Sequence, residues 1–572
     1  MVEQVSAFKL PQSGEVASDN LSSEQTCGYF AGEKDETTQN LNALHNSFAA
    51  VNHLPNELLV EIFSYVNCDD SMQSHHMLLN LTMVCHYWRE VSIMAPKLWT
   101  NIEIPSNLDL LRLQLQRSCD APVKLSYKGI GGRRFVDDNS VCRLMDMISP
   151  HASHIYSLHL SDFFAWYSAP SSSPVEMVLA ALDFPMPELE ALSFVFVSTQ
   201  SAPVPFEPPS DQFPRLRSLS LSGVYILWTS ALLQNLVFLA IQLRDDSFDP
   251  QGRLYDSASM DTVLNALEAC PSLEDLKLTW CGPKVPDTSN PARFVSLPRL
   301  QRLSLEDNAD TLSALLSHLI TPPQATITAV IDGPLPMGGE DPGLDLPLPR
   351  TILSVIPQDT SHLTNLSEVR AIALHVDGQG PCEFVAYGNP DCSESSIRLE
   401  MRCNFIFPDW MPEELDRLSL LPMATREFTE LFASIGAPVS TLRVFGFLGF
   451  MRERDWVDTL ACFPHLKYLG VGYAGNVCAL FHALDIRMPP RPPRAVVCPH
   501  LQVLDLDLVS TSASFGQHSA GALLACLRSR ARVGARLKRL RLKGFDAMWY
   551  HRIRKMMKHL VDKFSFVADP GC

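Results

Sequence analysis

The chain has 572 residues, too many for one small core, and its 46% apolar and 19% charged residues exclude a protein that is disordered throughout. Its 46 Lys and Arg stand against 63 Asp and Glu, and this net charge of −17 argues against nucleic-acid binding, which needs a basic face. Fifteen Cys without a C-x-x-C pair, no run of 18 apolar residues and no signal-like N-terminus predict a cytoplasmic or nuclear protein without a membrane partner.

Residues 1–50 are rich in Ser, Gln, Asn and Glu, with seven acids against two bases. Apolar residues recur there at no helix or strand period. Such a composition cannot bury enough apolar surface to offset the entropy of ordering, so we predict a disordered tail over 1–50.

The segment 51–101 is different, because its apolar residues recur at i, i+3 and i+4, the spacing of amphipathic helices. One helix is expected to follow Pro55, a second to cover Met77–Val91, and a short return to end near Leu98-Trp99. About 50 residues bury little of their own surface. Part of this apolar surface is therefore expected to bind a partner.

The order and spacing of these residues resemble the F-box family. The matching pattern runs Leu54-Pro55-x-Glu57-Leu58-Leu59-x-x-Ile62-Phe63, then Leu79-x-Leu81-x-x-Val84-Cys85-x-x-Trp88-Arg89, then Leu98-Trp99. The resemblance implies binding to a Skp-type adaptor, and through it to a cullin-RING ligase core. The residues that match the adaptor-facing motif, some of which must instead pack the domain's own core, are Leu54, Pro55, Leu58, Leu59, Ile62, Phe63, Val84, Trp88 and Leu98.

One phrase, Pro-x-Leu-x-x-Leu-x-apolar, returns along residues 151–563. It begins at Pro187, Pro214, Pro271, Pro298, Pro464 and Pro499, with proline-free versions at Ile155, Leu236, Val369, Val439 and Leu537. The alternation places the leucines on one side of a short strand, and a helical pattern such as Met260–Cys270 precedes several of the prolines. A single strand and helix cannot cover their own apolar face, so neighbouring repeats are expected to stack.

The repeated phrase resembles an irregular leucine-rich repeat, and the fold expected is of the α/β class. We expect a small all-α F-box bundle followed by a repeat solenoid, a curved parallel sheet with helices. The expected domains are the tail at 1–50, the F-box at 51–101, a linker and first solenoid elements at 102–150, the solenoid at 151–563 and a C-terminal tail at 564–572. Intervals of 69 and 70 residues separate Leu300, Val369 and Val439, where we expect degenerate repeats.

Proline-rich stretches interrupt the repeats at Ala202–Phe213, Asp332–Arg350 and Met488–Pro499. Proline cannot continue a helix or a central strand, so these stretches are expected to be surface loops. Loops of this kind also line the binding rim of repeat proteins, and both interpretations remain open.

The sequence offers one motif that is typical of an enzyme, Gly470-Val-Gly472-Tyr-Ala-Gly475. A dinucleotide site also needs an acid about 20 residues further on, whereas Asp485 and Asp505 lie 10 and 30 residues after Gly475. No phosphate-loop, zinc-ligand or nucleophile motif accompanies it. We therefore expect a protein that is not an enzyme and that needs neither cofactor nor metal.

Positive charge collects near the end of the chain, where residues 527–563 contain thirteen Lys and Arg against two Asp. This run is either a solvated face of the last repeat or a docking patch for an acidic or phosphorylated partner. The candidate substrate-binding residues in it are Arg552, Arg554 and Lys555.

Together the two resemblances imply a substrate-recognition subunit of an SCF-type cullin-RING ubiquitin ligase, with the adaptor on the F-box and an unidentified target protein on the repeats. Such a receptor has no catalytic residue and acts by raising the effective concentration of its target. Two alternatives remain: an F-box repeat scaffold that does not lead to degradation, and an α/β enzyme that binds a nucleotide at the glycine motif.

Overall fold

The computed structural model describes residues 41–42, 44–66, 74–104, 107–128, 138–161, 174–196, 204–209, 211–243, 258–283, 293–331, 355–357, 359–376, 382–403, 421, 425, 431–432, 434–446, 451–472, 477–486, 497–507, 517–545, 554, 556–557 and 559–568. The chain forms two compact units, one of Met1–Glu103 with Asp109–Val123 and one of Ile104–Leu108 with Lys124–Cys572. None of the helices in the described part of the chain combines the length and the apolar character that crossing a bilayer requires.

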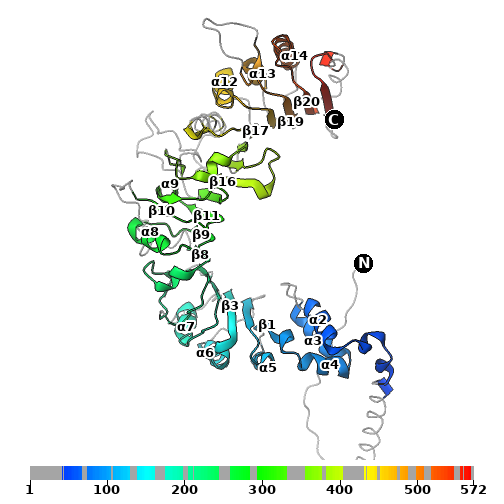
Figure 1. Cartoon of the computed structure of the whole chain (residues 1–572), viewed down its shortest axis with the longest axis vertical. Helices are drawn as coiled ribbons and strands as arrows, with labels where there is room; N and C mark the ends of the chain where they lie inside the picture. Colours follow the sequence, from blue (N-terminus) through cyan, green and yellow to red (C-terminus); the bar gives the residue numbers. More distant parts are fainter. Residues whose placement is uncertain are drawn as a thin grey trace, which may run out of the picture. The chain divides into compact units, whose positions relative to one another are not determined.

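The first unit is helical (Figure 1). Its elements are the 3-10 helix η1 (Ala50–His53), α2 (Asn56–Val66), α3 (Ser74–Val84), α4 (His86–Ile93), the 3-10 helix η2 (Pro96–Trp99), β1 (Asn101–Glu103) and most of α5 (Leu108–Ser118). The compact unit extends past the segment 51–101 expected for the F-box, because α5 from Asp109 onward belongs to it. Residues 1–40 of the expected tail lie outside the described residues.

The helix expected over Met77–Val91 is divided in two. Helix α3 ends at Val84 and α4 begins at His86, because Cys85 between them is extended, with φ −157° and ψ 170°. The Cys85 sulfur accepts a hydrogen bond from the Trp88 backbone N–H at 3.4 Å. Cys85 therefore acts as the N-cap of α4, a role usually taken by an oxygen side chain.

The second unit combines strands and helices. Its strands are β2 (Val123–Lys128), β3 (Ile155–Ser161), β4 (Ala191–Val195), β5 (Val204–Phe206), β6 (Ser218–Ser222), β7 (Val224–Ile226), β8 (Phe238–Gln242), β9 (Asp275–Thr279), β10 (Val295–Ser296), β11 (Arg302–Asp307), β12 (Leu319–Ile320), β13 (Thr326–Ile331), β14 (Ala371–Val376), β15 (Cys382–Tyr387), β16 (Ile397–Cys403), β17 (Thr441–Gly446), β18 (Tyr468–Gly472), β19 (Val503–Asp507), β20 (Arg539–Phe545) and β21 (Lys563–Ala568). Its helices are α6 (Asp138–Ile148), η3 (Ser149–His154), α7 (Pro174–Ala181), η4 (Ala231–Asn235), α8 (Met260–Glu268), α9 (Ala309–Leu316), η7 (Thr364–Glu368), η8 (Glu394–Ser396), α12 (Glu453–Ala461), α13 (Cys478–Leu484) and α14 (Gln517–Arg532).

The repeated phrases form neighbouring parallel strands, which confirms the prediction of short strands. One run follows the order β3-β4-β6-β8-β9-β11-β13, and a second follows β17-β18-β19-β20-β21. In the first run, the first leucine of each strand from β4 to β11 stands directly opposite the first leucine of the next strand. These leucines are at most 1% exposed: Leu192, Leu219, Leu239, Leu276 and Leu303. Alternate residues of each strand thus supply a continuous apolar layer.

The region around Val369, where degenerate repeats were expected, differs from the prediction. Between the two parallel runs the sheet order is β13-β16-β15-β14-β17, with β15 antiparallel to both of its neighbours. Only residues 377–381 join β14 to β15, too few for a parallel crossover but enough for an antiparallel return. The strand order therefore reverses here relative to the chain.

The helices lie against the sheet through apolar side chains. Figure 1 shows α12, α13 and α14 following one another on one side of β17, β19 and β20. The predicted helix Met260–Cys270 is confirmed as α8, whose Val263, Leu264 and Leu267 are buried. The expected C-terminal tail differs, because Lys563–Ala568 forms β21 with Phe564 and Phe566 opposite leucines of β20.

A glycine between β6 and β7 supplies a stability test of this fold. Gly223 has φ +73°, its N–H donates to the Gln242 oxygen at 3.0 Å, and a Cβ there would overlap the Phe196 carbonyl. Gly223→Ala is expected to lower the free energy of unfolding by about 2–4 kcal/mol, from left-handed strain and overpacking together. Gly521→Ala in α14, with nothing within 4 Å of the new Cβ, should instead raise it by about 0.5–1 kcal/mol. Urea unfolding of both variants measures the difference, and equal effects would contradict the geometry at Gly223.

Candidate binding site on the helical unit

The helical unit closes a small apolar core. Leu59 and Phe63 from α2, Leu78 from α3, Val91 from α4, and Leu98 and Trp99 from η2 are at most 6% exposed. The Phe63 and Trp88 ring centroids are 4.8 Å apart, within the range of favourable aromatic pairs. These side chains hold the three helices together.

Two hydrogen bonds tie α4 to η1 and to the start of α2. The Trp88 indole N–H donates to Asn52 Oδ1 at 2.7 Å, and the Tyr87 hydroxyl is 2.8 Å from Asn56 Oδ1. Leu54 is half-buried against the same core. The half-buried Trp88 therefore has a structural role, because its ring packs inward and its polar atom is already bonded.

A second face of α2 is apolar and is not covered by the described residues of this unit. Leu58, Ile62 and Tyr65, spaced i, i+4 and i+7, are 51%, 45% and 73% exposed. We call these three residues the α2 stripe. The stripe lies about 100° around the helix from Leu59 and Phe63, because consecutive residues turn by that angle. Helix α2 thus has one apolar face in the core and another open to a partner.

The nine residues predicted to face the adaptor divide into three groups. Pro55, Leu58, Ile62 and Val84 are exposed, Leu54 and Trp88 are half-buried, and Leu59, Phe63 and Leu98 lie inside the core. Sequence reasoning did not select Tyr65, although its position seven residues after Leu58 places it on the same face.

An ion pair borders the stripe. Lys97 Nζ in η2 lies 3.0 Å from Glu61 Oε2 in α2, and both side chains are more than half exposed. Such a surface pair contributes about 0–1 kcal/mol and weakens with salt. Its effect is to hold η2 beside α2 rather than to place an unpaired charge at the apolar surface.

The other candidate residues lie in the second unit. Arg552 and Lys555 fall outside the described residues, and Arg554 is exposed. Arg530, counted in the same basic run, is instead 1% exposed and donates to the Val497 and Cys498 carbonyls at 3.0 and 2.7 Å. Burial lowers the pKa of its guanidinium. The number of Lys and Arg residues in 527–563 is therefore larger than the number of positive charges that face solvent.

The glycine motif does not have the geometry of a dinucleotide turn. Gly470 and Gly472 lie within β18, where Gly470 stands opposite Arg443 of β17 and Asp505 of β19. A dinucleotide fingerprint instead places its glycines in the turn after the strand, at the N-terminus of a helix. Gly475 lies outside the described residues. Among those that are described, no three His, Cys, Asp or Glu side chains are grouped as ligands for one metal ion.

Comparison with known families agrees with this geometry. Residues 51–105 match the family model described as F-box-like. The match runs from η1 past β1 and includes α2, α3, α4 and η2, hence both the core and the α2 stripe. It covers about a tenth of the chain. A search of the curated proteins found no match to this sequence.

Proposed function

We propose that the chain is the substrate-recognition subunit of an SCF-type cullin-RING ubiquitin ligase. Its F-box-like domain would bind a Skp-type adaptor through the α2 stripe, and its second unit would bind a target protein. The receptor itself is non-catalytic and works in the cytoplasm or nucleus, where it holds the target near the ubiquitin-conjugating enzyme carried by the ligase core.

The observation that carries the proposal is an apolar helix face left uncovered inside the F-box-like match. Burying a Leu, Ile or similar side chain completely contributes about 1.5–3 kcal/mol. Leu58 and Ile62 are already about half covered in the free chain, so each supplies only part of that amount. An interface of standard size, about 1,600 Å², requires these side chains together with neighbours such as Val84.

The proposed role of the second unit rests on its sheet. We interpret the parallel runs β3–β13 and β17–β21 as irregular leucine-rich repeats, whose inward leucines are buried and whose outward residues differ from strand to strand. For example, Lys277, Ser304 and Thr328 occupy equivalent outward positions on β9, β11 and β13. A surface varied in this way suits recognition of one particular protein.

Immunoprecipitation with and without a proteasome inhibitor tests the function. The wild-type chain should recover the adaptor in both conditions and its target chiefly under inhibition. The variant Leu58→Asp/Ile62→Asp should lose the adaptor, keep the target and recover it equally in both conditions. If the wild type recovers adaptor and target equally with and without inhibitor, and no ubiquitinated target forms, the chain is a scaffold without a role in degradation.

A further inference from the structure

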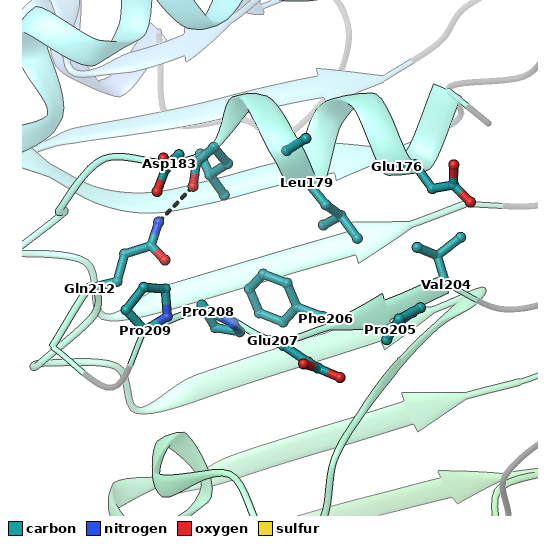
Figure 2. Close-up of a pocket in the computed structure, with 12 residues that line it drawn as sticks. Glu176, Leu179, Asp183, Val204, Pro205, Phe206, Glu207, Pro208, Pro209 and Gln212 are labelled. Atoms are coloured by element: carbon teal, nitrogen blue, oxygen red, sulfur yellow. Dashed lines mark hydrogen bonds between the residues drawn. The ribbon is translucent and has the colours of Figure 1, made fainter. Parts of the chain in front are cut away.

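A pocket of about 440 Å³ lies in the second unit between α7 and the strand β5 (Figure 2). Leu179 and Leu182 line it from the α7 side, and Val204 and Phe206 line it from β5. Among the described strands, β5 pairs with β7 alone in a two-stranded sheet, separate from the large sheet. The volume falls within the range of small-ligand and side-chain pockets.

Carboxylates surround this apolar floor. Glu176, Asp183 and Glu207 are exposed, line the pocket and have no ion pair or hydrogen bond within the described residues. The segment 144–214, which contributes all of the lining, has eight Asp or Glu and no Lys or Arg. The first cation after it, Arg215, is paired with Glu188. The pocket therefore has a negative rim without a cation of its own.

An amide side chain in the pocket lining supplies a hydrogen-bond acceptor. Gln212 is 6% exposed, and its Nε2 donates to the Leu182 and Phe184 carbonyls at 2.6 and 3.2 Å. Its Oε1 has no hydrogen-bond donor among the described residues, and Figure 2 shows it on the side of the pocket toward Pro208 and Phe206. Because this oxygen is accessible from the pocket, it can accept a hydrogen bond from a ligand that donates one.

The arrangement suits an elongated cation rather than a metal ion. Within the described part of the chain, these carboxylates do not come together as three ligands of one metal. An arginine or lysine side chain has the complementary form, with an apolar stem and a charged, hydrogen-bonding head. The stem fits the floor at Leu179 and Phe206, while the head donates to the carboxylates and to Gln212 Oε1.

We propose that this pocket binds an arginine or lysine side chain from a basic segment of the target protein. As a statement about targets, the inference rests on the proposed function; binding of a basic peptide, however, needs no adaptor and is measurable separately. The pocket lies between α7 and β5, far along the chain from the basic run at 527–563. Its carboxylates would select positively charged targets, whereas the basic run would select acidic ones.

The probe is a fluorescein-labelled nonapeptide with Arg-Leu-Arg between glycine–serine flanks, titrated with the full-length chain and followed by fluorescence anisotropy. The matched peptide carries citrulline, which keeps the shape of arginine but is neutral. The arginine peptide should bind at least about tenfold more tightly than the citrulline peptide. Raising the salt from about 0.05 to 0.5 M should weaken it severalfold. Equal binding of the two peptides, or none by either, would overturn the proposal.

The variant Glu176→Gln/Asp183→Asn/Glu207→Gln removes the three carboxylates and should weaken the arginine peptide at least about tenfold. Leu179→Trp fills the pocket without changing charge and should have a similar effect. An unchanged midpoint of thermal unfolding shows that each variant remains folded. If the arginine peptide binds the charge variant as it binds wild type, the pocket is not its site.

The matched control is Glu394→Gln/Glu453→Gln/Asp458→Asn, which removes three exposed carboxylates of the same unit far along the chain from the pocket. It should bind the arginine peptide as wild type does. Equal weakening by control and pocket variants would indicate nonspecific attraction to a chain of net charge −17 and would overturn the site. Titration of the same proteins with the adaptor distinguishes the two proposals. If the wild-type chain binds the arginine peptide but not the adaptor, the ligase role is contradicted and the peptide site is not.

Discussion

The variant Leu58→Asp/Ile62→Asp is expected to weaken binding of a Skp-type adaptor at least about 100-fold while leaving the free energy of unfolding within about 0.5 kcal/mol of wild type. Both side chains are about half exposed in the free chain, so aspartates there remain hydrated before binding. In the proposed complex they would be buried in place of apolar side chains, and burying an unpaired carboxylate is strongly unfavourable. Isothermal titration calorimetry with the purified adaptor measures the loss.

Met94→Asp is the matched control, because Met94 is 80% exposed at the end of α4 and lies outside the α2 stripe. It adds one negative charge to the same unit and should leave adaptor affinity unchanged. Undiminished binding by the stripe variant would show that the adaptor uses another surface. Equal weakening by both variants would indicate a general charge effect.

Phe63→Ala, unlike the stripe variant, is expected to lower the stability of the unit strongly. It should weaken adaptor binding as well, because the unfolded unit cannot bind. Phe63 is 1% exposed and packs against the Trp88 ring. Removing a buried phenyl ring costs about 3–5 kcal/mol, a large share of the stability of a unit this small. Urea unfolding, followed by the fluorescence of the chain's eight tryptophans, two of which (Trp88 and Trp99) lie in this unit, measures the change in the free energy of unfolding.

The two variants respond differently to a stabilising osmolyte. Trimethylamine oxide favours burial, so it should refold Phe63→Ala and restore part of its adaptor binding. The stripe variant is already folded and should gain nothing. A loss of less than about 1 kcal/mol in Phe63→Ala would contradict the assignment of this ring to the core.

The sequence could not divide the F-box residues between core and surface. Leu58 precedes Leu59 and Ile62 precedes Phe63, so two apolar stripes run side by side along α2. Periodicity identifies the helix, but either member of each pair could face inward until α3, α4 and η2 are in place. Leu54 is an example, because it is half-buried against the core. The double substitution Leu54→Ala/Pro55→Ala would therefore change both the folding of the unit and its binding to the adaptor.

The parallel strands of the second unit were more predictable than the binding surface of the F-box-like unit, because the repeated leucine phrase determines both where a strand lies and which of its sides is buried. Leu276 and Leu303, for example, stand directly opposite each other in the predicted alternation. The reversed order of β14, β15 and β16 could not be predicted, since β15 carries no such phrase. The pocket depends on contacts such as that of Gln212 with Leu182, 30 residues apart in sequence. In the sequence, the one feature that relates to the pocket is the absence of Lys and Arg from residues 144–214.

The most direct test of the proposed function is a calorimetric titration of the full-length wild-type chain with a purified Skp-type adaptor. The proposed function predicts a one-to-one complex with submicromolar affinity and a negative heat-capacity change, the sign of apolar burial. The two proteins should also elute together in gel filtration. Separate elution and no heat of binding, with the first unit shown to be folded, would contradict the ligase role.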